Sequence, residues 1–182
     1  MTFRRNITIA LVVGTGAALA AAISVQAQVK ITGEKINFPK DFAKGVLYGT
    51  VDRADNKQFR ELYTSQAAVD AAKKGQMLPH GTVITMVQYA AKLDAQGNPE
   101  KGADGRFIKT NIVGYTVMEK QKGWGAEIPA EIRNGEWEYR AFRADQTPNP
   151  QANLENCYKC HKPLDPKVDF LFSYDRMAGT KK

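Results

Sequence analysis

The 182-residue chain has few side chains that bind transition metals or form cross-links, with only two cysteines and two histidines. Both cysteines lie in one short segment, Cys157 and Cys160, and His161 follows directly. The other histidine, His80, is in a Pro-His-Gly turn, where a surface position is expected. A long-range disulfide is therefore excluded. A structural zinc site, which needs four ligands, would have to recruit His80 or a distant carboxylate.

The chain also lacks a concentrated basic surface and internal repeats. Its formal net charge is +7, but the lysine pairs at 73–74, 120/122 and 181–182 are scattered and no aromatics are interleaved with them. This pattern predicts solvated surface lysines and no nucleic-acid partner. A mildly basic rim would favour an acidic redox partner.

The N-terminus has the features of an export signal. Arg4 and Arg5 precede an apolar stretch at 7–23, and Val25-Gln26-Ala27 is a small-x-small cleavage signal. We expect residues 1–27 to be a cleaved signal peptide that directs the protein to a periplasm, with an uncleaved membrane anchor as the alternative. The mature chain would then have no membrane span, with a flexible lead at 28–37, one domain at 38–178 and a tail at 179–182.

The mature chain is predicted to be α+β, with Phe38 and Phe42 as core anchors. β-rich segments lie at 46–51, 59–64, 82–89, 107–118 and 137–144, and 93–106 is predicted to be a long hairpin loop. Residues 65–75 have a capping serine, an alanine-rich body and a closing glycine, as a helix does. Successive strands with few helices between them indicate an antiparallel sheet on which helices pack.

A last helix is predicted from 150 to about 161. Asn149 would cap it, Pro150 would take the first helical position, and Pro163 prevents its continuation. Cys157, Cys160 and His161 would therefore lie near its C-terminal end.

Three chemistries suit this Cys-x-x-Cys-His motif. A disulfide would close a very small loop, and a redox-active pair works best at a helix N-terminus, where the helix dipole stabilises thiolate. Zinc lacks further ligands. In c-type cytochromes, by contrast, this motif attaches haem: Cys157 and Cys160, one helical turn apart, form thioethers with one porphyrin, and His161 binds the iron. We favour one covalent haem c, because the cysteine count and the predicted export agree with it.

The order of these features resembles the cytochrome P-460 family, which includes the β-sheet cytochromes c-prime-beta. The matching features cover about residues 36–177: Phe38-Pro39-Lys40-Asp41-Phe42 before a Val-Leu-Tyr-Gly-Thr strand, a helix followed by Gly81-Thr82-Val83, Gly105-x-Phe107, Trp137 with its strand, the Cys157–His161 motif and Asp169-Phe170-Leu171-Phe172. The resemblance implies an antiparallel sheet with packed helices, usually a homodimer, and a haem with His161 as proximal ligand and its distal face against the sheet.

The resemblance also marks a departure at Met86. In members that oxidise hydroxylamine, a lysine in the strand after the Gly-Thr-Val turn is cross-linked to the haem, and a nearby carboxylate assists proton transfer. Met86 stands at that lysine position here. Three other lysines are poor substitutes for the lysine of the cross-link: Lys73, Lys74 and Lys92. The candidate carboxylates are Glu136, Glu138 and Glu155, although the simpler expectation for each is a solvated surface charge. Trp137, Tyr139 and Phe142 are expected to be core or haem-packing aromatics.

The role of Met86 therefore distinguishes the possible functions from one another. As an apolar cap on an open iron site it would leave room for nitric oxide or a similar small ligand; as a sulfur ligand it would suit electron transfer; as core filler it would do neither. The leading hypothesis is a periplasmic monohaem cytochrome that binds such a ligand and exchanges electrons with a periplasmic partner. A hydroxylamine-oxidising enzyme and a His/Met electron carrier are the alternatives.

Overall fold

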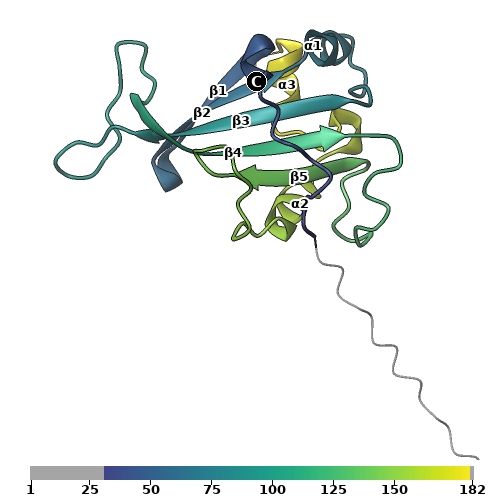
Figure 1. Cartoon of the computed structure of the whole chain (residues 1–182). Helices are drawn as coiled ribbons and strands as arrows, with labels where there is room; N and C mark the ends of the chain where they lie inside the picture. The colour runs from purple at the N-terminus through teal and green to yellow at the C-terminus, as the bar shows by residue number, and fades with distance from the viewer. Residues whose placement is uncertain (1–30, 181–182) are drawn as a thin grey trace, which may run out of the picture.

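The computed structural model describes residues 31–180, and an antiparallel sheet forms its centre. The five strands lie in chain order, β1-β2-β3-β4-β5 (Figure 1). They are β1 (Val46–Arg53), β2 (Gln58–Thr64), β3 (Thr82–Ala91), β4 (Lys109–Lys120) and β5 (Trp137–Phe142). The helices are α1 (Gln66–Lys73), α2 (Glu155–His161) and α3 (Tyr174–Ala178), with 3₁₀ turns at Phe42–Lys44, Ala54–Asn56 and Pro166–Val168. The predicted α+β class is confirmed.

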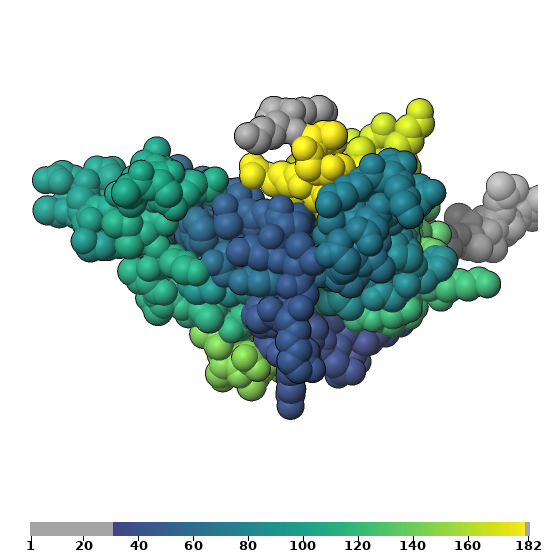
Figure 2. All heavy atoms as spheres, turned by 90° about the horizontal axis from the view of Figure 1, so that it is seen from above, coloured from purple at the N-terminus to yellow at the C-terminus, as the bar shows by residue number. Residues whose placement is uncertain are grey.

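The two faces of the sheet are covered by different parts of the chain. The three α-helices pack on one face, which we call the motif face because α2 contains the Cys-x-x-Cys-His motif. Its core includes Ile84, Met118, Trp137, Tyr139 and Tyr158. The N-terminal segment crosses the opposite face, so that it and the C-terminal part of the chain lie on either side of the sheet (Figures 1 and 2).

Aromatic side chains fasten the N-terminal segment to the opposite face. The ring of Phe38 lies edge-on to Tyr115 and Phe142, with centroid distances of 4.9 and 5.2 Å. Ile36 is fully buried in the same cluster, although the sequence places it in a polar lead. The packed domain therefore includes residues before Phe38. The predicted signal peptide lies outside the described residues.

Helix α1 begins and ends as its sequence predicts. The Ser65 hydroxyl accepts a hydrogen bond from the backbone N–H of Ala68 at 3.2 Å, which satisfies one of the free donors of the first turn. Gly75 closes the helix with a left-handed φ of 68°, a conformation that glycine adopts without steric cost.

The last predicted helix, in contrast, begins later than expected. Helix α2 starts at Glu155, not at 150. The Asn149 side chain accepts from the backbone N–H of Gln151 at 3.1 Å, and the N–H of Ala152 bonds to the Asn149 carbonyl. These bonds form a separate turn, because an asparagine can cap a turn as readily as a helix. The prediction that the motif lies at the C-terminal end of a helix is confirmed.

The connection between β3 and β4 forms a long arm. Strand β4 begins at Lys109 rather than at Phe107, and two isolated bridges, Leu93 with Pro99 and Lys101 with Phe107, hold residues 92–108 together. The arm projects from one end of the sheet (Figures 1 and 2). Within residues 31–180, no helix has the length and apolar character that a membrane crossing requires.

Candidate functional site

Helix α2 presents the two thiols and the imidazole from one short element. Cys157 is half-buried against the motif-face core, and Cys160 is exposed; neither is in a disulfide. Residues three apart on a helix share a face, so both sulfurs point to the same side. The end of the helix is held against the β4–β5 connection by the Lys162 ammonium, which donates to the carbonyls of Ala130 and Arg133, both at 2.9 Å.

The thiol chemistry of Cys157 argues against a redox-active pair. Burial, with a smaller contribution from neighbouring Cys160, raises the pKa of the Cys157 thiol to about 11. Thiolate is the reactive form in disulfide exchange, so this thiol is a poor nucleophile at neutral pH.

The imidazole of His161 is held by one nitrogen and is free at the other. Nδ1 lies 2.7 Å from the carbonyl oxygen of Phe170. Since a carbonyl can only accept, Nδ1 carries the proton, and the neutral ring has its lone pair on Nε2. Burial holds the pKa of His161 below its usual value, although the bond to Phe170 acts in the opposite direction. This is the tautomer that a metal-binding histidine needs.

A turn after the 3₁₀ helix Pro166–Val168 supplies that carbonyl. Asp169 and Phe170 both have left-handed backbones, with φ of 55° and 57°. Aspartate adopts this conformation with modest cost, but a bulky phenylalanine does so rarely, and such residues cost about 1–3 kcal/mol each. The surrounding contacts must therefore hold the turn in place.

The Asp169 carboxylate holds this turn against the motif face of the sheet. It is 1 % exposed and accepts from the Lys120 ammonium at 2.9 and 3.0 Å, from the Trp137 indole N–H at 3.1 Å and from the backbone N–H of Leu78 at 2.9 Å. Three donor groups, which make four hydrogen bonds to one buried carboxylate, offset its loss of hydration.

Met86 lies on the motif face, in the middle strand of the sheet. Its direct cross-strand neighbours are Leu62 on β2 and Thr116 on β4, and Ala141 follows on β5. Directly paired residues of antiparallel strands project to the same side, so this row faces the side of the sheet that bears α2.

Two polar residues that the sequence interpretation did not single out share this face. Arg60 and Gln88 form the next pair along β2 and β3. The Arg60 guanidinium donates to Gln58 at 2.8 and 3.0 Å, and burial, together with the nearby Arg53 charge, holds its pKa below the usual arginine value. Gln88 donates to the Thr116 hydroxyl at 2.9 Å. The face near Met86 is thus apolar at Leu62 and Ala141, and polar beside them.

None of the three candidate carboxylates is in the strand row that contains Met86. Glu138 projects to the opposite face, where it is buried and paired with Lys35 at 2.7 Å. Glu155 is exposed and forms an i,i+4 ion pair with Lys159. Glu136 bonds to His80 Nε2 at 2.5 Å on the surface, which agrees with the expected surface position of that histidine.

The three aromatic candidates of β5 divide between the faces. Trp137 and Tyr139 are fully buried on the motif face, and the Tyr139 ring lies 4.7 Å from Tyr158 and 5.2 Å from His161, centroid to centroid. Phe142 belongs to the cluster of the opposite face. A further aromatic, Phe172, has its ring 5.1 Å from that of His161 and is 63 % exposed.

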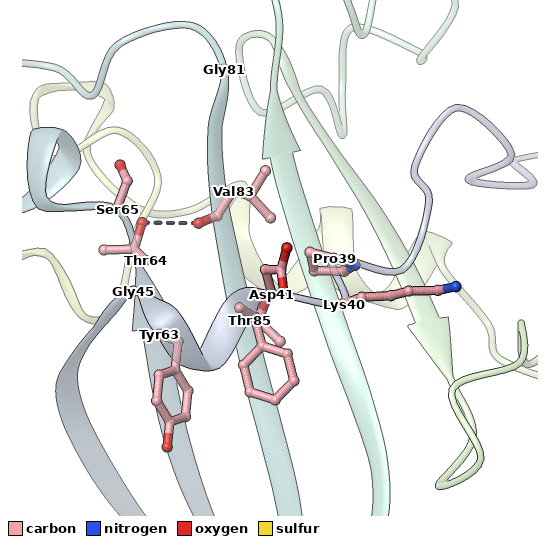
Figure 3. Close-up of a pocket in the computed structure, with 11 residues that line it drawn as sticks. Pro39, Lys40, Asp41, Gly45, Tyr63, Thr64, Ser65, Gly81, Val83 and Thr85 are labelled. Atoms are coloured by element: carbon pink, nitrogen blue, oxygen red, sulfur yellow. Dashed lines mark hydrogen bonds between the residues drawn. The ribbon is translucent and has the colours of Figure 1, made fainter.

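A separate pocket of about 400 Å³ lies beside the N-terminal segment (Figure 3). Among its lining residues, Tyr63, Val83 and Thr85 project to the opposite face, so the pocket is distinct from the motif. Within the described part of the chain, no group of three or more histidine, cysteine, aspartate or glutamate side chains is arranged to hold a metal ion.

The donor set fits a c-type haem. Two uncommitted thiols lie one turn apart, the neighbouring imidazole has its free Nε2, and an exposed phenyl ring borders it. With the antiparallel sheet, these features indicate a haem-binding α+β protein of the cytochrome class.

The sequence model of Cytochrome P460 matches residues 39–173, and the chain belongs to this family. Membership implies a haem cofactor and a cytochrome function. No curated protein matches the chain.

Proposed function

We propose that this protein is a periplasmic monohaem c-type cytochrome that binds nitric oxide or a similar small ligand at an open distal site. Cys157 and Cys160 would hold the haem by two thioethers, and His161 Nε2 would be the proximal iron ligand. The haem would supply the iron on which the small ligand binds. The observation that carries the proposal is the His161–Phe170 hydrogen bond, which prepares Nε2 as a ligand.

The strand residues of the motif face support an open distal site. The row Leu62, Met86 and Thr116 contains no imidazole and no lysine. Among the strand residues that face this side in the described structure, the one lysine is Lys120, and its ammonium is committed to Asp169. A lysine cross-link of the hydroxylamine-oxidising kind therefore has no available partner there.

Nitric oxide titration of the reduced protein tests this proposal. The protein is produced with a cytochrome c maturation system, reduced without oxygen and titrated while its optical spectrum is recorded. We expect a five-coordinate ferrous spectrum that changes with one nitric oxide per haem. A six-coordinate ferrous spectrum that does not respond to nitric oxide would contradict the open site.

The same spectra separate the alternatives. If Met86 is a sulfur ligand, Met86→Ala will abolish a low-spin signal, while Met77→Ala, at a methionine that is 55 % exposed, will leave it intact. A red-shifted ferrous Soret band, with a haem-peptide mass beyond two thioethers, would instead indicate the cross-linked, hydroxylamine-oxidising type.

The proposal includes a homodimer and a periplasmic electron-transfer partner. Light scattering of the purified protein measures its oligomeric state. A mass of two chains is expected, and a mass of one chain would contradict the homodimer.

A further inference from the structure

Asp169, Lys120 and Trp137 form a buried hydrogen-bonded group, which we call the Asp169 cluster. It has no direct part in the proposed haem attachment, but it lies at the turn that contacts the proposed proximal histidine. Asp169 and Lys120 are 1 % and 4 % exposed, and Trp137 is fully buried. Each group comes from a different part of the fold: Lys120 ends β4, Trp137 begins β5 and Asp169 follows a 3₁₀ helix.

The cluster is connected to His161 through one residue. Asp169 precedes Phe170, and the Phe170 carbonyl is the acceptor for His161 Nδ1. Both residues of the turn have left-handed backbones, so the direction of that carbonyl depends on contacts that hold the turn. The carboxylate of Asp169 makes those contacts with the sheet.

We propose that Asp169, held by Lys120 and Trp137, is a positioning residue for the proximal histidine. By fixing the turn, it aims the Phe170 carbonyl at Nδ1, which sets the tautomer and orientation of His161 and raises the basicity of Nε2. A more basic ligand stabilises ferric over ferrous haem, so the cluster lowers the reduction potential. This inference rests on the proposed function, in which His161 binds the iron.

The decisive variant is Asp169→Asn in the haem-loaded protein, because asparagine keeps the size of the side chain but removes the charge. Two quantities are measured: the midpoint potential, and the exchange rate of the His161 Nδ1–H by NMR. We expect the potential to become more positive and the exchange to become about tenfold faster or more, as for loss of an ordinary hydrogen bond.

A matched control separates positioning from general destabilisation. Glu61→Gln also neutralises a buried carboxylate that accepts from several donors, but on the opposite face of the sheet. It should lower stability while leaving the potential and the Nδ1–H exchange at wild-type values. If Glu61→Gln shifts both readouts as Asp169→Asn does, the positioning role is refuted.

A milder variant keeps the inference testable if Asp169→Asn does not fold. Trp137→Phe removes the indole donor to Asp169 together with part of the buried ring, but it keeps the Asp169 charge and its Lys120 partner, so it should shift both readouts in the same direction by a smaller amount. Wild-type values in the folded variants would overturn the inference while leaving the proposed function intact. If the wild-type protein takes up no haem, the proposed function fails, and the Nδ1–H exchange of the purified protein still decides whether Asp169 orders His161.

Discussion

The two histidines differ in which ring nitrogen is engaged in a hydrogen bond. His161 donates from Nδ1 to a backbone carbonyl and keeps Nε2 free, whereas the exposed His80 has its Nε2 against Glu136. Only His161 follows two cysteines that can attach a porphyrin. At the scale of single residues, the hydrogen-bond partners therefore leave Nε2 free in His161 and engaged in His80, which supports the proposal that His161 binds the iron.

Glu61 gives a prediction at the residue scale. It is 6 % exposed and accepts from Lys109, Tyr63 and Tyr89. Burial raises its pKa, but these donors together outweigh burial, and the net pKa lies below the usual 4.5. A depressed pKa in the folded state means stability that is present above about pH 4.5 and is lost as the pH falls through the folded value.

Glu61→Gln should accordingly lower the free energy of unfolding by about 1.5–3 kcal/mol at neutral pH, as expected for hydrogen bonds to a charged group. The gap to wild type should narrow below about pH 4.5. Urea denaturation from neutral pH to below about pH 4.5 measures this difference in stability, with Glu34→Gln as a control at an exposed glutamate. A gap that stays constant with pH would show that the charge of Glu61 is not responsible.

Element boundaries were predictable where one local signal dominates. The serine cap and closing glycine of α1 predict its ends, and runs of residues that favour β structure predict the strands. The start of α2 was not predictable, because Asn149 and Pro150 suit a turn as well as a helix. Ile36 was missed because a single apolar residue in a polar segment has no periodicity.

The cap of α1 gives a prediction at the scale of the element. Ser65→Ala removes the acceptor for the Ala68 N–H and should cost about 1 kcal/mol of folding free energy. Ser65→Asp restores an acceptor at the same position and should remain within a few tenths of a kcal/mol of wild type. Thermal or urea unfolding of the three proteins measures this, and equal stability of all three would contradict the capping role.

At the scale of the whole molecule, the site depends on strand register and on contacts between distant segments. The motif and Met86 could be identified from the sequence, but not the row in which Met86 lies with Leu62 and Thr116, nor Arg60 and Gln88 beside it. A one-residue change of register would move every side chain to the other face. The Asp169–Lys120 pair was missed for a similar reason, since nothing local in the sequence joins β4 to the last turn.

The central claim is that α2 carries one covalently bound haem. The most direct measurement is the intact mass and optical spectrum of the protein after production with a cytochrome c maturation system, beside a Cys157→Ala/Cys160→Ala variant. The account predicts that the wild-type mass increases by one haem that resists acid–solvent extraction, and that the variant lacks it. A wild-type protein that retains two free thiols and the mass of the bare chain would contradict the account.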